Sequence, residues 1–125
     1  YRDLTGAIQL GQITGFSLTN GIIYGANENE FQFELDQTAL PSGSIERMMI
    51  RTTQATGPEF GPNYWQNQSP GFVSTGDRDF HLGEYSNARD KSDAPSPDAL
   101  TDLDGNSRYC GTGSGFDLGC FEYCP

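Results

Sequence analysis

The hydrophobic positions of the chain recur mainly with the two-residue period of a β-strand, and a helical period is nearly absent. The stretch EFQFEL at residues 30–35 shows this most clearly, because Phe and Leu alternate there with Glu and Gln. Further short strands are expected at residues 7–10, 16–18, 21–25, 45–51, 72–73 and 79–82, each bounded by turn-forming residues. From Gly83 onward the pattern predicts mostly loop.

The spacing of the apolar strands favours a repeating architecture. Strand centres near residues 22, 48 and 72 lie about 25 residues apart, which fits the length of one coil of a β-solenoid. A β-sandwich is the alternative, and it would place strands about 8 to 12 residues apart with hairpin turns between them. The pattern favours the solenoid.

Composition and charge narrow the function classes. Only 34% of the 125 residues are hydrophobic and 16 are Gly, which indicates many turns around a thin core. The formal net charge of −10 disfavours nucleic acid and anionic membranes as partners, because phosphate groups require clustered Lys and Arg. No apolar run approaches the roughly 20 residues of a transmembrane helix, so no transmembrane segment is expected.

The C-terminal half contains a distinctive series of short motifs. In chain order these are FHL at 80–82, SNARDKSD at 86–93, TDLDGNSR at 101–108 and FDLGCFEY at 116–123. The series resembles the C-terminal end of secreted right-handed parallel β-helix proteins of the choice-of-anchor and pectate-lyase-like type, and it is similar to surface lipoproteins of Bacteroidota. The stretches NGIIYG and SPGFV, at 20–25 and 69–73, resemble earlier coils of that family.

The resemblance implies an all-β fold, a right-handed parallel β-helix of which this chain holds the last coils and a loop-rich cap. Residues 1–82 are expected to form the coils and residues 83–125 the cap, together one structural domain of a longer chain. The first coil would need a neighbour, so another protein chain or an upstream part of the same protein is the expected partner. The expected location is extracellular or on the outer-membrane surface of a bacterium.

The TDLDGNSR motif is a candidate calcium loop through Asp102 and Asp104. An EF-hand loop requires an oxygen ligand at position 1, Gly at position 6 and Glu at position 12. Placing Gly105 at position 6 puts Leu100 at position 1 and Gly111 at position 12, so this register fails, as does a start at Asp102. A tight turn, in which Asp side chains accept backbone N–H groups, is the favoured interpretation. The family resemblance implies that Arg108 forms an ion pair with these acids. Calcium at another geometry is left open.

The best candidate for ligand binding is an aromatic and amide-rich segment with Pro on both sides, which predicts a loop leaving the coils. Aromatic rings stack on the apolar faces of sugars, while amides bond to hydroxyl groups. The candidate residues are Asn63, Tyr64, Trp65 and Asn67. The alternative is that Trp65 simply covers the side of a coil.

Catalytic chemistry has less support. His81, the single histidine, lies in an alternating strand and is expected to face outward or make a polar contact. Carboxylate pairs for glycoside hydrolysis could be drawn from Asp77, Asp79, Glu84, Asp90 and Asp93, but 17 acidic residues in 125 make such pairs common by chance. No catalytic residue is therefore assigned.

Three cysteines, Cys110, Cys120 and Cys124, leave at least one thiol unpaired. Either Cys110 pairs with Cys120 or the thiols are free. Their spacing does not fit a zinc ribbon.

Two functions follow as hypotheses. The main one is a non-enzymatic binding or accessory subunit of a bacterial surface complex, with polysaccharide as a candidate ligand. The alternative is the C-terminal part of a β-helical polysaccharide lyase or hydrolase whose catalytic coils lie outside this chain.

Overall fold

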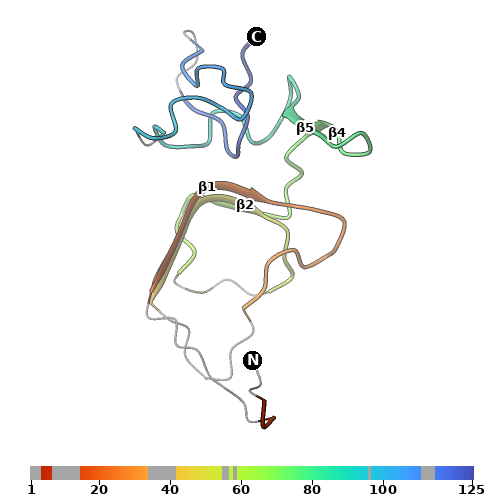
Figure 1. The fold of residues 1–125 in the computed structure, drawn as a ribbon, viewed down its shortest axis with the longest axis vertical. Helices are drawn as coiled ribbons and strands as arrows, with labels where there is room; N and C mark the ends of the chain where they lie inside the picture. The colour runs from red at the N-terminus through yellow and green to blue at the C-terminus, as the bar shows by residue number, and fades with distance from the viewer. Residues whose placement is uncertain are drawn as a thin grey trace.

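The computed structural model describes residues 4–6, 15–33, 42–54, 57, 59–95, 97–110 and 115–125. Two small sheets account for the regular structure in these ranges (Figure 1). The larger sheet has the order β1-β2-β3 and is parallel throughout, whereas β4 and β5 form an antiparallel hairpin. The strand bounds are β1 Phe16–Ile23, β2 Gly43–Ile50, β3 Tyr64–Gln66, β4 Phe72–Ser74 and β5 Asp79–Leu82.

The prediction of a right-handed parallel β-helix is wrong, because the five strands of the described residues form two small sheets that do not close into a solenoid. The 25-residue repeat on which that prediction depended is not kept. From β1 to β2 the register advances 27 residues, from 16 to 43, but from β2 to β3 it advances only 16, from 48 to 64. The strand near residue 72 belongs to the hairpin instead of the parallel stack.

Single strands were predicted well where the alternation is local. The strands expected at 45–51, 72–73 and 79–82 correspond to β2, β4 and β5. No strand forms at residues 30–33, although Phe31 and Phe33 are half-buried and the intervening Gln32 is exposed, as the alternation predicted. The strand expected at 7–10 and the end of the 30–35 stretch lie outside the described residues.

One bend runs through both long strands. Asn20 in β1 and Arg47 in β2 have positive φ angles of 58° and 49°, and the β1–β2 ladder skips this pair. A left-handed residue interrupts side-chain alternation, so Ile45 and Met48 face the same interior although they lie three apart. The two strands predicted at 16–18 and 21–25 are thereby joined into a single bent strand, visible at the upper edge of the sheet in Figure 1.

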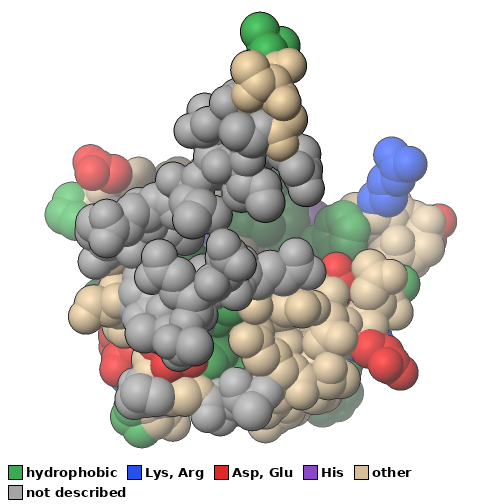
Figure 2. Space-filling model, turned by 90° about the horizontal axis from the view of Figure 1, so that it is seen from below, with side chains coloured by type: hydrophobic (Ala, Val, Ile, Leu, Met, Phe, Trp, Pro, Cys, Tyr) green, Lys and Arg blue, Asp and Glu red, His purple; other side chains and the backbone are tan. Residues whose placement is uncertain are grey.

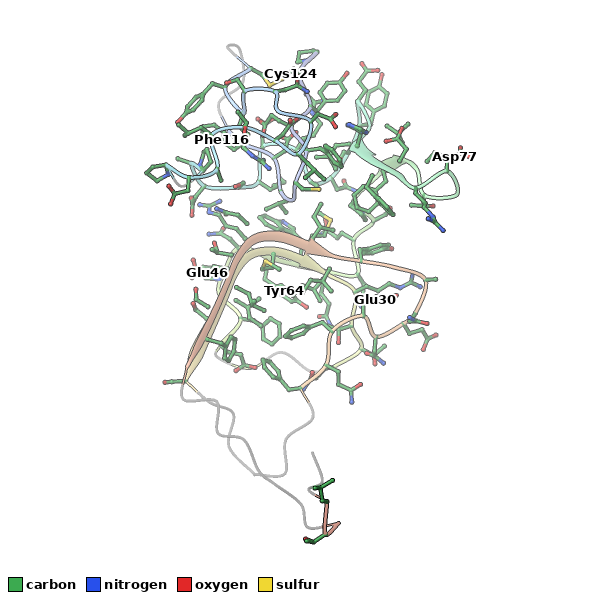
Figure 3. The ribbon with its side chains drawn as sticks, viewed as in Figure 1. Glu30, Glu46, Tyr64, Asp77, Phe116 and Cys124 are labelled. Carbon is green, nitrogen blue, oxygen red and sulfur yellow. A yellow bond between two sulfur atoms is a disulfide. The ribbon has the colours of Figure 1, made fainter. Side chains whose placement is uncertain are left out.

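The concave face of the bent sheet holds the first core. Its buried members are Ile45, Met48 and Ile50. Aromatic side chains from the connecting segments pack against them, among them Phe33, whose ring centroid lies 5.3 Å from that of Phe16. Figure 3 shows Tyr64 pointing into this space below the bend. Burial of these apolar side chains stabilises the sheet at roughly 1.5–3 kcal/mol for each fully buried residue.

The opposite face of the sheet is covered by the C-terminal half of the chain, which lies above the bend in Figure 1. Ile22, Met49 and Trp65 are register partners across the three strands and form one apolar row on this face. Leu82 and Leu118 pack against this row, and together these residues form the second core. A parallel sheet is therefore buried on both faces, as such sheets generally are.

Polar contacts attach the C-terminal half at the bend itself. Asn20 accepts the Asp93 N–H through its side chain at 3.1 Å and the Gly119 N–H through its carbonyl at 3.1 Å. Arg47 pairs with the Asp93 carboxylate at 2.6 Å. Asn20 and Arg47 thus bend the strands through their left-handed backbone conformation, and they also supply the polar groups that bind the C-terminal half to the sheet.

A disulfide joins Cys110 to Cys124, and Cys120 is free and exposed. The alternative Cys110–Cys120 pairing is therefore wrong, and the favoured interpretation of free thiols holds for Cys120 alone. Within the described residues no helix could cross a membrane.

Candidate functional site

A groove of about 830 Å³ opens between the end of β1, the β4–β5 hairpin and the C-terminal loops. Its walls are mainly apolar and include four aromatic rings. The lining residues are Gly21, Ile22, Tyr24, Phe72, Asp77, Arg78, Asp79, Phe80, His81, Leu82, Leu103, Leu118, Gly119, Cys120 and Phe121. Its size and lining are typical of a small-molecule site.

The hairpin forms one wall because a tight turn at residues 75–78 reverses the chain between β4 and β5. The Arg78 N–H donates to the Thr75 carbonyl at 3.2 Å, and Arg78 has a φ of 60°. The Phe72 and Phe80 rings then meet edge to face, with centroids 5.4 Å apart. Asp77 stands near the tip of this hairpin in Figure 3.

His81 is the polar centre of the groove. Its Nδ1 lies 2.5 Å from Asp79 Oδ1 and its Nε2 lies 2.7 Å from Asp104 Oδ2. The imidazole also stacks on the Phe121 ring, with centroids 4.0 Å apart. The expected polar contact of His81 is confirmed, and three segments of the chain meet at this one side chain.

Asp104 reaches His81 because Asp102 builds the turn before it. The buried Asp102 accepts the N–H groups of Asp104 and Asn106 through Oδ1, at 3.0 and 2.9 Å. Leu103 then donates its N–H to the Cys120 carbonyl at 2.9 Å, which fixes the turn against the C-terminal segment. The interpretation of TDLDGNSR as a turn is confirmed. Asp102 stabilises the turn through backbone N–H groups, whereas Asp104 contacts His81.

The contacts of the imidazole shift the pKa values of His81 and Asp79. Hydrogen bonding to Asp104, and then to Asp79, raises the pKa of His81 above its ordinary value of 6.5. The hydrogen bond from His81 lowers the pKa of Asp79. Both shifts favour a protonated imidazole beside an ionised Asp79.

This arrangement is poorly suited to proton transfer. A general base needs a ring nitrogen free to accept a proton, yet both nitrogens of His81 already face a carboxylate. No group of three or more His, Cys, Asp or Glu residues in the described parts of the chain could hold a metal ion.

Arg108 does not pair with Asp102 or Asp104, contrary to the expectation. Its guanidinium lies 3.4 Å from Glu122 and donates to the Gly119 carbonyl at 2.8 Å. The partner was missed because Glu122 lies fourteen residues further along the chain.

The aromatic and amide segment is placed differently from the prediction. It is not a loop leaving the body, because Tyr64 and Trp65 belong to β3 and point to opposite faces of the sheet. The Tyr64 hydroxyl is buried without a hydrogen-bond partner among the described residues. The half-buried Trp65 packs in the second core with Lys91 5.8 Å from its ring.

The amides of this segment also differ in role. Asn67 exchanges two hydrogen bonds with the backbone of Thr52, at 3.0 Å each, and so serves the fold. Asn63 is half-buried beside β3. None of the four residues lines the groove, and ligand binding by them stays a prediction.

Sequence reasoning left the groove unrecognised. One signal was available, since Asp79 and His81 are two apart in a strand and must share a face. No local sequence pattern predicts that Asp104 and Phe121 contact His81. Comparisons with protein-family models, curated proteins and solved structures found no match for this chain.

Proposed function

We propose that this protein is a non-enzymatic binding domain of an extracellular or cell-surface bacterial assembly, with a carbohydrate as the ligand of its groove. The observation that carries the proposal is the combination of aromatic walls with a polar centre at His81. Sugars present apolar C–H faces and hydroxyl groups together, so a site that binds them needs aromatic rings next to carboxylates.

Three further features support the location. The Cys110–Cys124 disulfide is typical of proteins in an oxidising compartment. The net charge of −10 suits a soluble surface, and Figure 2 shows several acidic side chains around the visible face with few basic ones. The resemblance of the C-terminal motifs to secreted bacterial surface proteins points the same way.

The proposal is tested by screening a panel of bacterial and plant polysaccharide fragments, followed by calorimetry on those that bind. Phe80→Ala removes an exposed ring from the groove and should weaken binding roughly tenfold, or about 1.4 kcal/mol. Tyr85→Ala is the matched control, because Tyr85 is an 89% exposed aromatic residue outside the groove.

A Trp65→Ala variant separates the two candidate sites. It should destabilise the second core while leaving the affinity of the folded protein unchanged. Absence of binding across the panel would contradict the proposal. Binding that survives Phe80→Ala but is lost in folded Trp65→Ala would place the ligand on β3.

A further inference from the structure

The hairpin and the turn at residues 102–106 approach each other across the rim of the groove. His81 joins them, since one ring nitrogen contacts Asp79 on its own strand and the other contacts Asp104 on the turn. We infer that His81 is a proton-controlled latch: as imidazolium it ties β5 to the turn and narrows the groove, and loss of its proton releases the turn. The inference adds regulation to the proposed binding site.

The hydrogen-bonding capacity of imidazole carries this inference. A neutral imidazole has one N–H donor and one acceptor nitrogen, whereas imidazolium has two donors. Ionised carboxylates are acceptors only. His81 faces a carboxylate oxygen at both nitrogens, so only the protonated ring satisfies both contacts. After deprotonation one nitrogen lone pair would face a carboxylate, and that contact must lengthen.

The contact to Asp104 is the one expected to open. Asp79 is held beside His81 in any case, because its Oδ1 also accepts the His81 backbone N–H at 3.1 Å. Asp104 sits on an exposed turn, next to the 72% exposed Leu103. Once the Asp104 contact has opened, the hydrogen bond from the Leu103 N–H to the Cys120 carbonyl is a main remaining contact between the turn and the groove wall.

The charges around the latch favour the closed form. Asp79 on β5 and Asp104 on the turn face the imidazole directly. Asp77 and Arg78 from the hairpin and the thiol of Cys120 line the same groove. The raised pKa of His81, caused first by Asp104 and then by Asp79, agrees with this balance.

The test uses the protein without ligand. His81 is the single histidine, so NMR titration of its ring reports one unambiguous pKa. We expect a value above 6.5 that falls towards 6.5 in Asp104→Asn, which cannot supply the negative charge. Asp77→Asn is the control, because Asp77 lines the groove but bonds to Ser74, and it should leave the value nearly unchanged.

Opening of the turn is read from hydrogen exchange at the Leu103 amide. Its protection should fall as pH rises through the pKa of His81. The fall should be about tenfold for each unit by which the pKa of His81 in the closed form exceeds its pKa in the open form. His81→Gln should remove this pH dependence.

A pKa at or below 6.5, or equal pH profiles in wild type and His81→Gln, would overturn the latch. Because these measurements contain no carbohydrate, failure of the glycan screen bears on the ligand alone. With a bound glycan in hand, its affinity should change over the same pH range in wild type and stay flat in His81→Gln.

Discussion

The guanidinium of Arg108 lies 3.4 Å from the carboxylate of Glu122, and both side chains are largely buried, with 11% and 4% of their surfaces exposed. Glu122 also accepts the backbone N–H of Asp117 at 3.2 Å. This pair connects the turn after residue 106 to the C-terminal segment, and so it supports the wall of the groove that carries Phe121. Its stability contribution is open to a direct test.

Arg108→Met should destabilise the protein by about 3–5 kcal/mol, because it leaves a buried carboxylate without its cation. The variant also loses the hydrogen bond to the Gly119 carbonyl. Urea denaturation measures the loss. The double variant Arg108→Met/Glu122→Gln should recover part of it, and a double variant no more stable than Arg108→Met would contradict a role for the unpaired charge.

Glu122→Gln should change how stability depends on pH. Burial raises the pKa of Glu122 above its ordinary 4.5, so the folded state holds its proton more tightly than the unfolded chain does. Such a group lowers stability as pH rises from about 4.5 through the folded-state pKa. Relative to wild type, Glu122→Gln should therefore gain stability between pH 4 and pH 7. Urea midpoints of wild type and Glu122→Gln at both pH values provide the measurement. If the stability difference between the two proteins is the same at pH 4 and pH 7, the pKa of Glu122 is not raised in the folded state.

His81 should give a pH-dependent stability difference of the same sign as that of Glu122, because both groups have a raised pKa in the folded state, but at higher pH. Its pKa is raised in the folded state, so its contribution is complete below 6.5 and is lost as pH rises through the folded-state pKa. At the acid end, Asp79 has a lowered pKa, so its contribution is lost as pH falls from 3.8 through the folded-state value. Thermal denaturation of wild type and His81→Gln should diverge most near pH 5–6 and converge at alkaline pH. Parallel curves over this range would argue against the ion pairs.

The disulfide offers a comparison within one segment. Cys110 and Cys124 are separated by 14 residues, and closing a loop of this length contributes about 3 kcal/mol. Cys124→Ser should therefore lower the free energy of unfolding by roughly 2–3 kcal/mol. Cys120→Ser, at an exposed free thiol, should leave it nearly unchanged. A large loss in Cys120→Ser with a small one in Cys124→Ser would assign the bridge to a different pair.

The bend at Asn20 can be separated into its backbone and side-chain parts. Asn20→Val forces a β-branched residue into a left-handed conformation, at about 1–2 kcal/mol, and removes the acceptor for the Asp93 N–H, at about 1 kcal/mol. Asn20→Gly relieves the backbone and loses only the acceptor. Chemical denaturation should thus rank wild type above Gly and Gly above Val. Equal stability of the two variants would show that the bend costs nothing.

Local chemistry was readable from the sequence. Strands at 45–51 and 79–82 were predicted because alternation involves only neighbouring residues, and the turn at Asp102 was predicted because an Asp side chain bonds to amides two and four residues ahead. The same reasoning could have paired Asp79 with His81, which lie two apart on one strand.

The remaining features were decided by tertiary structure. The parallel stack ends after three strands because the chain turns into a hairpin at residue 72, and the apparent 25-residue repeat gave no sign of that change. Asp104 lies beside His81, and Cys124 is bonded to Cys110, in a C-terminal half that packs on the row formed by Ile22, Met49 and Trp65. Contacts of this kind depend on the path of the whole chain, so no local pattern contains them.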